Sequence, residues 1–192
     1  MLRTVFLDRD GVINFDSASY ILSWDEFKFI PGSIEAIARL TSAGFRIFII
    51  TNQSAVGRGL ITTDVLFNIF SNMTRAIESG GGQIDGIFFC PHTPKDGCDC
   101  RKPLPGMILN ATKKYGINLD LACMVGDKPS DIKCARAAGC GYAILLGNNT
   151  ISDASHDPDL VPDIVLPDLK AAANRIISRL GKDLPRAKEP AL

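Results

Sequence analysis

A short apolar run that ends abruptly in two aspartates constrains this chain most. Residues 5–7 predict a buried strand, and Asp8, Arg9, Asp10 and Gly11 follow it directly. In open α/β sheets the loops after parallel strands converge on a crevice, and a side-chain period near two turns both aspartates toward it. Two such close anions require a cation or a shared proton, and oxygen ligands favour Mg²⁺. An isolated Asp-x-Asp also fits a simple polar turn.

Length and charge narrow the classes of protein that this chain can belong to. Its 192 residues suit one domain with a substantial core. The 21 basic and 21 acidic residues balance, which gives no electrostatic case for binding nucleic acid or membrane surfaces. No apolar stretch approaches the roughly 20 residues of a membrane span, and residues 1–3 enter a strand directly. We therefore expect a cytoplasmic monomer that acts on a small molecule.

Apolar periodicity alternates between strand and helix along the chain. We predict strands at residues 5–7, 46–50, 84–89, 122–125, 142–146 and 164–165. We predict helices at residues 31–43, 63–79, 105–115, 129–138 and 166–180, and an irregular loop or small hairpin at 12–30. This alternation favours an α/β fold with a mostly parallel sheet and helices on both faces, in one domain over residues 1–180. Residues 181–192 are expected to form a flexible tail.

Polar residues also follow other predicted strands. Thr51 brings a hydroxyl and an anion-binding backbone, Arg101 and Lys102 bring two cations before a helix, and residues 126–131 bring carboxylates. Each of these alone also fits a purely structural role: a turn or helix cap, a solvated pair of surface charges, or an acid at a helix N-terminus. Collected around one crevice, they supply what phosphoryl transfer requires: a nucleophile, a metal site, phosphate donors and an acid.

These strings, in this order, resemble the four motifs of the haloacid dehalogenase-like phosphatases: Asp8-Arg9-Asp10-Gly11-Val12, Thr51-Asn52, Lys102 and Gly126-Asp127-x-x-x-Asp131. Further strings resemble the histidinol-phosphate and heptose-bisphosphate phosphatase branch: Thr51-Asn52-Gln53-Ser54, Arg58-Gly59, Cys90-Pro91-His92, Cys98-Asp99-Cys100-Arg101-Lys102-Pro103, Pro105-Gly106-Met107 and Gly126-Asp127-Lys128. The resemblance covers roughly residues 3–147. It implies a Rossmann-like fold, without the cap domain of larger relatives and with a zinc loop.

The resemblance also implies catalytic roles. Asp8 would be the nucleophile that forms an aspartyl-phosphate, and Asp10 the acid and then the base. Mg²⁺ would be held by Asp8, the backbone carbonyl of Asp10, and Asp127, while Thr51 and Lys102 would bind phosphoryl oxygens. Asp8 must be ionised to attack, whereas Asp10 must hold a proton, so their environments must separate their pKa values.

Substrate recognition is expected from loops around the same crevice. Arg58 and Arg101 could clamp a second anionic group, which fits a sugar bisphosphate, and Asp16, Gln53 and Ser54 could meet sugar hydroxyls. The full set expected to bind substrate is Arg9, Asp16, Tyr20, Asn52, Gln53, Ser54, Arg58, Arg101 and Lys128.

A second constellation lies in one eleven-residue loop, with the pattern Cys90-x-His92-x5-Cys98-x-Cys100. Three sulfurs and an imidazole suit tetrahedral Zn²⁺ and leave no position for water, which predicts a structural site. The alternative is a set of reduced, unpaired cysteines. The remaining cysteines, Cys123, Cys134 and Cys140, are expected in the core. His156 is expected on the surface.

Two features disagree about the substrate. Residues 53–59 resemble the heptose-bisphosphate branch, whereas the five-residue zinc spacing resembles the histidinol-phosphate phosphatases. We expect D-glycero-D-manno-heptose 1,7-bisphosphate, with histidinol phosphate as the alternative. A zinc-stabilised module that only binds phosphorylated ligands is the non-enzyme alternative, although such a binder has no need of Asp10. A nucleic-acid 3′-phosphatase is disfavoured by the neutral charge.

Overall fold

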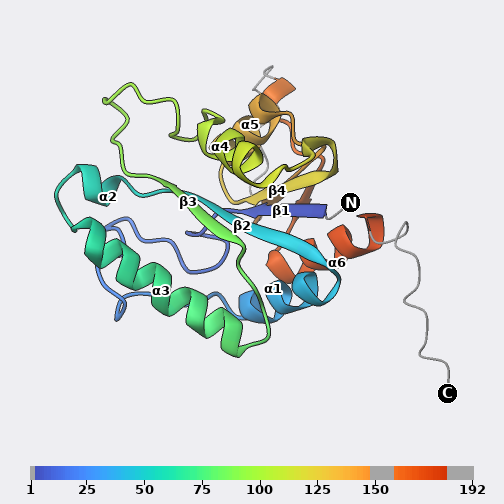
Figure 1. Ribbon diagram of the computed structural model, residues 1–192, viewed down its shortest axis with the longest axis horizontal. Coiled ribbons are helices and arrows are strands. Elements are labelled where there is room, and N and C mark those ends of the chain that lie inside the picture. The colour runs from blue at the N-terminus through green and yellow to red at the C-terminus, as the bar shows by residue number, and fades with distance from the viewer. Residues whose placement is uncertain (1–2, 148–157, 181–192) are drawn as a thin grey trace.

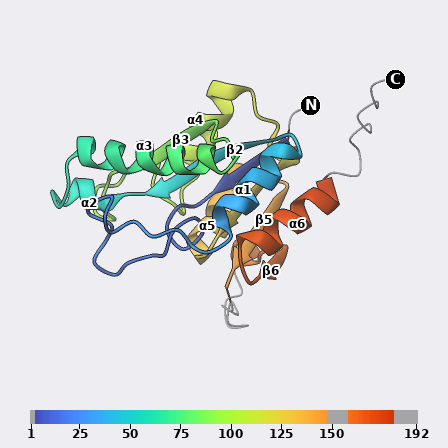
Figure 2. The ribbon, with the colours of Figure 1, turned by 90° about the horizontal axis from the view of Figure 1, so that it is seen from below.

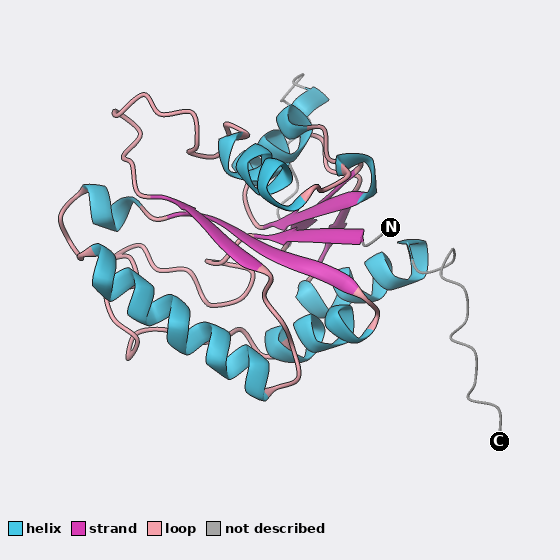
Figure 3. Ribbon diagram, viewed as in Figure 1, coloured by secondary structure: helices cyan, strands magenta, loops and turns pink. Residues whose placement is uncertain are grey.

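The computed structural model describes residues 3–147 and 158–180, and in this part of the chain six strands form one parallel sheet (Figures 1 and 3). Their spatial order is β3-β2-β1-β4-β5-β6, and every neighbouring pair is parallel. The bounds are β1 Arg3–Leu7, β2 Phe45–Asn52, β3 Gly86–Cys90, β4 Ala122–Gly126, β5 Tyr142–Leu146 and β6 Ile164–Leu166. The predicted α/β class and the parallel sheet are confirmed.

Helices cover both faces of this sheet (Figures 1 and 2). One face carries α1 (Ser33–Ser42), α3 (Thr63–Ser79) and α6 (Leu169–Leu180), and the other carries α4 (Gly106–Tyr115) and α5 (Pro129–Ala138). Alternating residues of β1 separate the two cores: Val5 and Leu7 belong to the first cluster and Phe6 to the second. Because both faces are buried, the central strands are apolar throughout.

Several predicted boundaries need correction. Leu166 ends β6, and α6 begins only at Leu169, because Pro167 interrupts the pattern and the Asp168 side chain accepts a hydrogen bond of 2.7 Å from Ala171 N. The strand expected from residue 84 begins at Gly86, since Asp85 instead uses its carboxylate to accept from Ile47 N at 2.8 Å.

Short elements were missed. The four-residue helix α2 (Ser54–Gly57) and the 3-10 turns at Leu119–Leu121 and Pro158–Leu160 are too short for a periodic signal. Helix α1 starts at Ser33 rather than at residue 31, because Gly32 adopts φ 85°. The predictions for His156 and for residues 181–192 fall outside the described residues.

The strand order places the polar strand ends together. It reverses between β1 and β4, which is where parallel sheets of this kind hold their ligands. Residues 8–32, all of which are described, form isolated bridges but neither a helix nor a named strand. The loop after the first predicted motif thus continues directly into α1. None of the described helices has the length and apolar character needed to cross a bilayer.

Candidate active site

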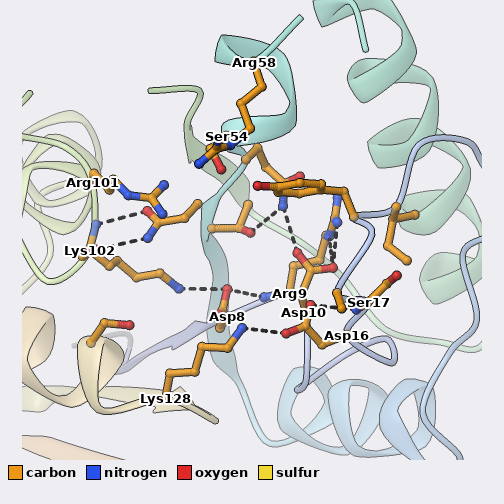
Figure 4. Close-up of a pocket in the computed structure, with 17 residues that line it drawn as sticks. Asp8, Arg9, Asp10, Asp16, Ser17, Ser54, Arg58, Arg101, Lys102 and Lys128 are labelled. Carbon is orange, nitrogen blue, oxygen red and sulfur yellow. Dashed lines mark hydrogen bonds and ion pairs between the residues drawn. The ribbon is translucent and has the colours of Figure 1, made fainter. Parts of the chain in front are cut away.

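A cavity of about 420 Å³ opens at the carboxyl ends of β1 and β2 (Figure 4). It brings together residues that the sequence separates by up to 122 positions, from Asp8 to Ser130. Asp127, the predicted metal ligand, is not among its lining residues. All the residues predicted to act in catalysis or substrate binding line the cavity: Asp8, Arg9, Asp10, Asp16, Tyr20, Thr51, Asn52, Gln53, Ser54, Arg58, Arg101, Lys102 and Lys128.

Asp8 sits at the end of β1 and is nearly buried. Its Oδ1 lies 2.8 Å from Lys102 Nζ and accepts a 2.7 Å hydrogen bond from the backbone N–H of Arg9. Burial raises the pKa of Asp8 to about 7, against the opposing charge of Lys102. The carboxylate is therefore poised to gain from a nearby cation, because added positive charge favours its ionised form.

Lys102 is buried between two carboxylates. Its Nζ lies 2.6 Å from Asp131 Oδ1 and donates a 2.9 Å hydrogen bond to Ile50 O, in addition to its contact with Asp8. Burial alone would lower the pKa of Lys102, but the charges of Asp131 and Asp8 outweigh it and raise that pKa. Asp131 is fully buried, and its Oδ2 accepts from Lys128 N at 3.0 Å. Asp131 thus caps α5, as its position suggested, and also holds Lys102 toward Asp8.

The residues present fit a divalent cation. Carboxylate oxygens of Asp8, Asp127 and Asp131 lie within 4.8 Å of one another. Within the described part of the chain, Asp127 Oδ1 is buried without a hydrogen-bond partner, and burial raises the pKa of Asp127 to about 6. Gly11, at φ 84°, leaves this space open, since a Cβ there would collide with the Asp127 carboxylate. Hard oxygen donors with an unpaired buried member are the donor set that Mg²⁺ prefers.

Asp10 is held by three neighbouring side chains. Its Oδ1 accepts from Arg9 Nε at 3.1 Å, Arg9 Nη2 at 2.6 Å and Asn14 Nδ2 at 2.9 Å, and its Oδ2 accepts from Gln53 Nε2 at 2.9 Å. Burial alone would raise the pKa of Asp10, but Arg9 and these hydrogen bonds lower it. The carboxyl groups of Asp8 and Asp10 therefore have separated pKa values, but their order is the reverse of the one expected from the sequence.

Three side chains that were expected to bind substrate instead form hydrogen bonds within the protein. The buried guanidinium of Arg9 pairs with Asp10. The amide of Asn52 donates to Lys102 O at 3.1 Å and accepts from Lys102 N at 3.0 Å, which ties the end of β2 to the loop before α4. Gln53 Nε2 bridges Asp10 and the hydroxyl of Thr51 at 2.8 Å. The sequence could identify these polar residues but not their partners.

Other predicted substrate residues lie around the rim. Asp16 Oδ2 and Lys128 Nζ form a half-exposed pair at 2.7 Å, which joins the 8–32 loop to α5. Arg58 lies beyond α2 at the far edge of the cavity from Lys128 (Figure 4). Arg101 Nη1 donates to His92 O at 3.1 Å, so this arginine is braced by the cysteine-rich loop. Cationic groups thus flank the cavity on opposite sides.

The cysteine-rich loop gathers its four predicted ligands. Cys90 Sγ lies 3.6 Å from Cys98 Sγ and 3.1 Å from Cys100 Sγ, and His92 Nδ1 lies 3.3 Å from Cys100 Sγ. Tetrahedral zinc with bonds of about 2.3 Å places its sulfurs roughly 3.8 Å apart. The 3.6 Å spacing is near this value and the 3.1 Å spacing is shorter, so the four groups are compatible with a zinc site that requires a small outward shift of Cys100 or Cys90. His92 would bind through Nδ1, which the sequence did not reveal. The three other cysteines are buried, as predicted: Cys123, Cys134 and Cys140.

Several known proteins are similar to this chain in sequence and fold. The D-glycero-beta-D-manno-heptose-1,7-bisphosphate 7-phosphatase of Pseudomonas aeruginosa is 46% identical over 176 residues, which cover 90% of this chain and 97% of the relative. The enzyme of the same name from Bordetella bronchiseptica is 45% identical over 148 residues, covering 77% of this chain and 83% of the relative. The chain belongs to the HAD-like hydrolase family.

A family model described as HAD-hydrolase-like matches residues 99–172, in agreement with this assignment. Structural similarity agrees as well. The crystal structure of D,D-heptose 1,7-bisphosphate phosphatase from B. bronchiseptica, complexed with magnesium and phosphate, superposes with a TM-score of 0.84 at 42% identity. It covers 92% of this chain and 99% of the crystallised chain. The resemblance stated from the motifs is therefore confirmed, and the chain groups with phosphatases of this family.

Proposed function

We propose that this protein is a Mg²⁺-dependent phosphatase that removes the C7 phosphate of D-glycero-D-manno-heptose 1,7-bisphosphate. The observation that carries the proposal is the Asp8–Lys102–Asp131 chain beside Asp127, in a cavity with cationic groups at both ends. The heptose-bisphosphate phosphatases at 45% and 46% identity support the choice of substrate. We also propose that it works as a cytoplasmic monomer, where the thiols of the zinc loop stay reduced.

The first half of the reaction uses two carboxyl groups. An oxygen of Asp8 attacks phosphorus, the P–O bond to C7 breaks, and the protonated carboxyl of Asp10 gives its proton to the leaving oxygen. Lys102 holds a phosphoryl oxygen, with Asp131 fixing its ammonium group. In the second half Asp10 takes a proton from the water that attacks the aspartyl-phosphate, which releases phosphate and restores Asp8.

Two ions have separate tasks in this proposal. Asp8 and Asp127, together with the backbone carbonyl of Asp10, would hold Mg²⁺, which supplies charge neutralisation for the phosphoryl oxygens and favours the ionised form of Asp8. Cys90, His92, Cys98 and Cys100 would hold structural Zn²⁺, which fixes the loop carrying Arg101 and Lys102.

The rim supplies the bisphosphate preference. We assign the C7 phosphate to Asp8 and Lys102 and the second phosphate to Arg58 and Arg101, which line the same cavity. Guanidinium groups bind phosphate with charge-assisted, bidentate hydrogen bonds. Binding energy gained at this remote group can be used to lower the barrier at C7.

A phosphate-release screen tests the assignment. The purified protein with Mg²⁺ is assayed against heptose 1,7-bisphosphate, heptose 7-phosphate and histidinol phosphate, with Asp8→Asn protein as the blank. We expect the bisphosphate to have the highest kcat/KM. Faster turnover of histidinol phosphate than of every bisphosphate would make histidinol phosphate the substrate. No turnover of any ester would favour the phospho-ligand binding module.

A further inference from the structure

Arg9 is among the most deeply buried large side chains of the described structure, with 1% of its surface exposed. Its guanidinium carbon lies 5.9 Å from the ring centroid of Phe27 and 5.9 Å from that of Phe70. These rings come from the 8–32 loop and from α3. A buried charge is costly unless it is paired, and this one is paired with Asp10.

The two oxygens of Asp10 are used unequally. Oδ1 accepts three hydrogen bonds, two from the Arg9 fork and one from Asn14. Oδ2 accepts one, from Gln53. A carboxylate oxygen has two lone pairs, so Oδ1 has no site left for a proton, whereas Oδ2 retains one. Hydrogen bonds to Oδ1 from Arg9 and Asn14 and to Oδ2 from Gln53 together fix the plane of the carboxyl group.

We propose that Arg9 is a positioning residue for proton transfer: it saturates Asp10 Oδ1 and so makes Oδ2 the oxygen that delivers the proton. This inference rests on the proposed function. In the first half-reaction the Oδ2–H bond breaks and an O–H bond forms on the leaving oxygen, which keeps the electron pair of the broken P–O bond. In the second half Oδ2 takes back one proton from the attacking water. Phe27 and Phe70 hold the guanidinium in plane for this task.

The chain contains a matched control for a stacked arginine. Arg46 lies 5.1 Å from the ring centroids of both Phe48 and Tyr115, and its Nε lies 3.6 Å from Asp85. Arg46 stands at the second residue of β2, at the opposite end of the sheet from Asp10. Loss of Arg46 therefore removes an arginine that also contacts two aromatic rings and an aspartate, without touching the proposed acid.

The test separates leaving groups that need a proton from one that does not. We compare the first turnover of wild type, Arg9→Lys, Arg9→Gln and Arg46→Gln in rapid-mixing experiments on heptose 1,7-bisphosphate and p-nitrophenyl phosphate. General acid catalysis is worth about 10²- to 10⁴-fold, and p-nitrophenolate leaves without it. Both Arg9 variants should lose at least about 10²-fold in first-turnover rate on the sugar ester, with KM little changed. Their burst of p-nitrophenolate should stay within about threefold of wild type, and Arg46→Gln should match wild type on both esters.

Other outcomes overturn the inference. Equal losses on both esters would make Arg9 a merely structural residue, and full activity of Arg9→Lys would show that its fork geometry is not needed. Phe70→Leu keeps Arg9 and Asp10 and provides a milder variant if the Arg9 variants do not fold; it should lose rate on the sugar ester alone. A wild-type protein inactive on both esters would instead refute the proposed function.

Discussion

The two ligand clusters of this protein differ in how the chain builds them. The sulfur cluster comes from one eleven-residue segment, the last residue of β3 and the loop after it, whereas the carboxylate cluster joins Asp8 at the end of β1 to Asp127 and Asp131 after β4. The first requires only local chain geometry, but the second requires the parallel pairing of β1 with β4. The comparison predicts that substitution of a carboxylate lowers activity and changes the free energy of unfolding little. Substitution of a cysteine ligand should lower the free energy of unfolding and affect activity only by loosening the loop.

The largest expected effect is the loss of turnover in Asp8→Asn. The substitution removes the attacking charge while nearly preserving shape, so phosphate release should fall to background. Circular dichroism and zinc content should remain those of wild type. Appreciable turnover by the purified variant would contradict the role of Asp8 and erase the contrast between the clusters.

Cys98→Ser should have the converse effect. Loss of one thiolate ligand weakens zinc binding, and the free energy of unfolding should fall by several kcal/mol because metal binding is coupled to folding. Activity should fall secondarily, as the loop that holds Arg101 and Lys102 loosens. Calorimetry and metal analysis check this, with Cys140→Ala as a thiol control outside the cluster. About one zinc per chain is expected in wild type purified under reducing conditions, and its absence there would remove the structural site.

Asp131→Asn tests the buried partner of Lys102. The variant keeps an oxygen near Nζ but loses the opposing charge, so kcat should fall by about 10²-fold as the ammonium group is less well held. Asp163→Asn, which removes the 2.9 Å partner of Arg136 far from the cavity, is the control and should keep wild-type kcat. If the two variants behave alike, Asp131 acts only as a cap of α5.

Arg58→Ala should change selectivity more than activity. A lost charge-assisted contact is worth roughly 1.5–3 kcal/mol, or about one to two decades in kcat/KM. The loss should fall on the 1,7-bisphosphate and spare heptose 7-phosphate, which lacks the second phosphate. Steady-state kinetics on both esters provide the measurement, and an equal loss on both would place the second phosphate elsewhere.

The smallest effect concerns pH. Burial raises the pKa of Asp8 to about 7 and that of Asp127 to about 6, from 3.8. The folded state without Mg²⁺ then binds more protons than the unfolded state between about pH 4 and 7, so these groups should lower stability as pH rises through that window. Thermal melts with zinc retained should show this slope, and saturating Mg²⁺ should flatten it. A slope unchanged in Asp8→Asn would exclude Asp8 as a source.

Much of the architecture, and the candidate residues for catalysis, could be predicted from the sequence alone. Strand and helix alternation indicated the parallel sheet, because side-chain periods are local properties of the backbone. The motif residues Asp8, Asp10, Lys102 and Asp127 could be identified because each follows a strand or precedes a helix. The candidate zinc ligands were identified from a different local signal, their close spacing within one short segment.

The sequence could not show which polar groups contact one another, because those contacts depend on the folded arrangement of the strands and loops. Arg9, Asn52 and Gln53 were expected to face substrate, yet they hold Asp10 and Lys102 in place. The sequence did not reveal that Asp131 forms an ion pair with Lys102. These partners lie up to 50 residues apart, and the direction of a side chain depends on the packing around it, as the two rings beside Arg9 illustrate. Residue type fixes which hydrogen bonds can form, and only the fold determines which of them do.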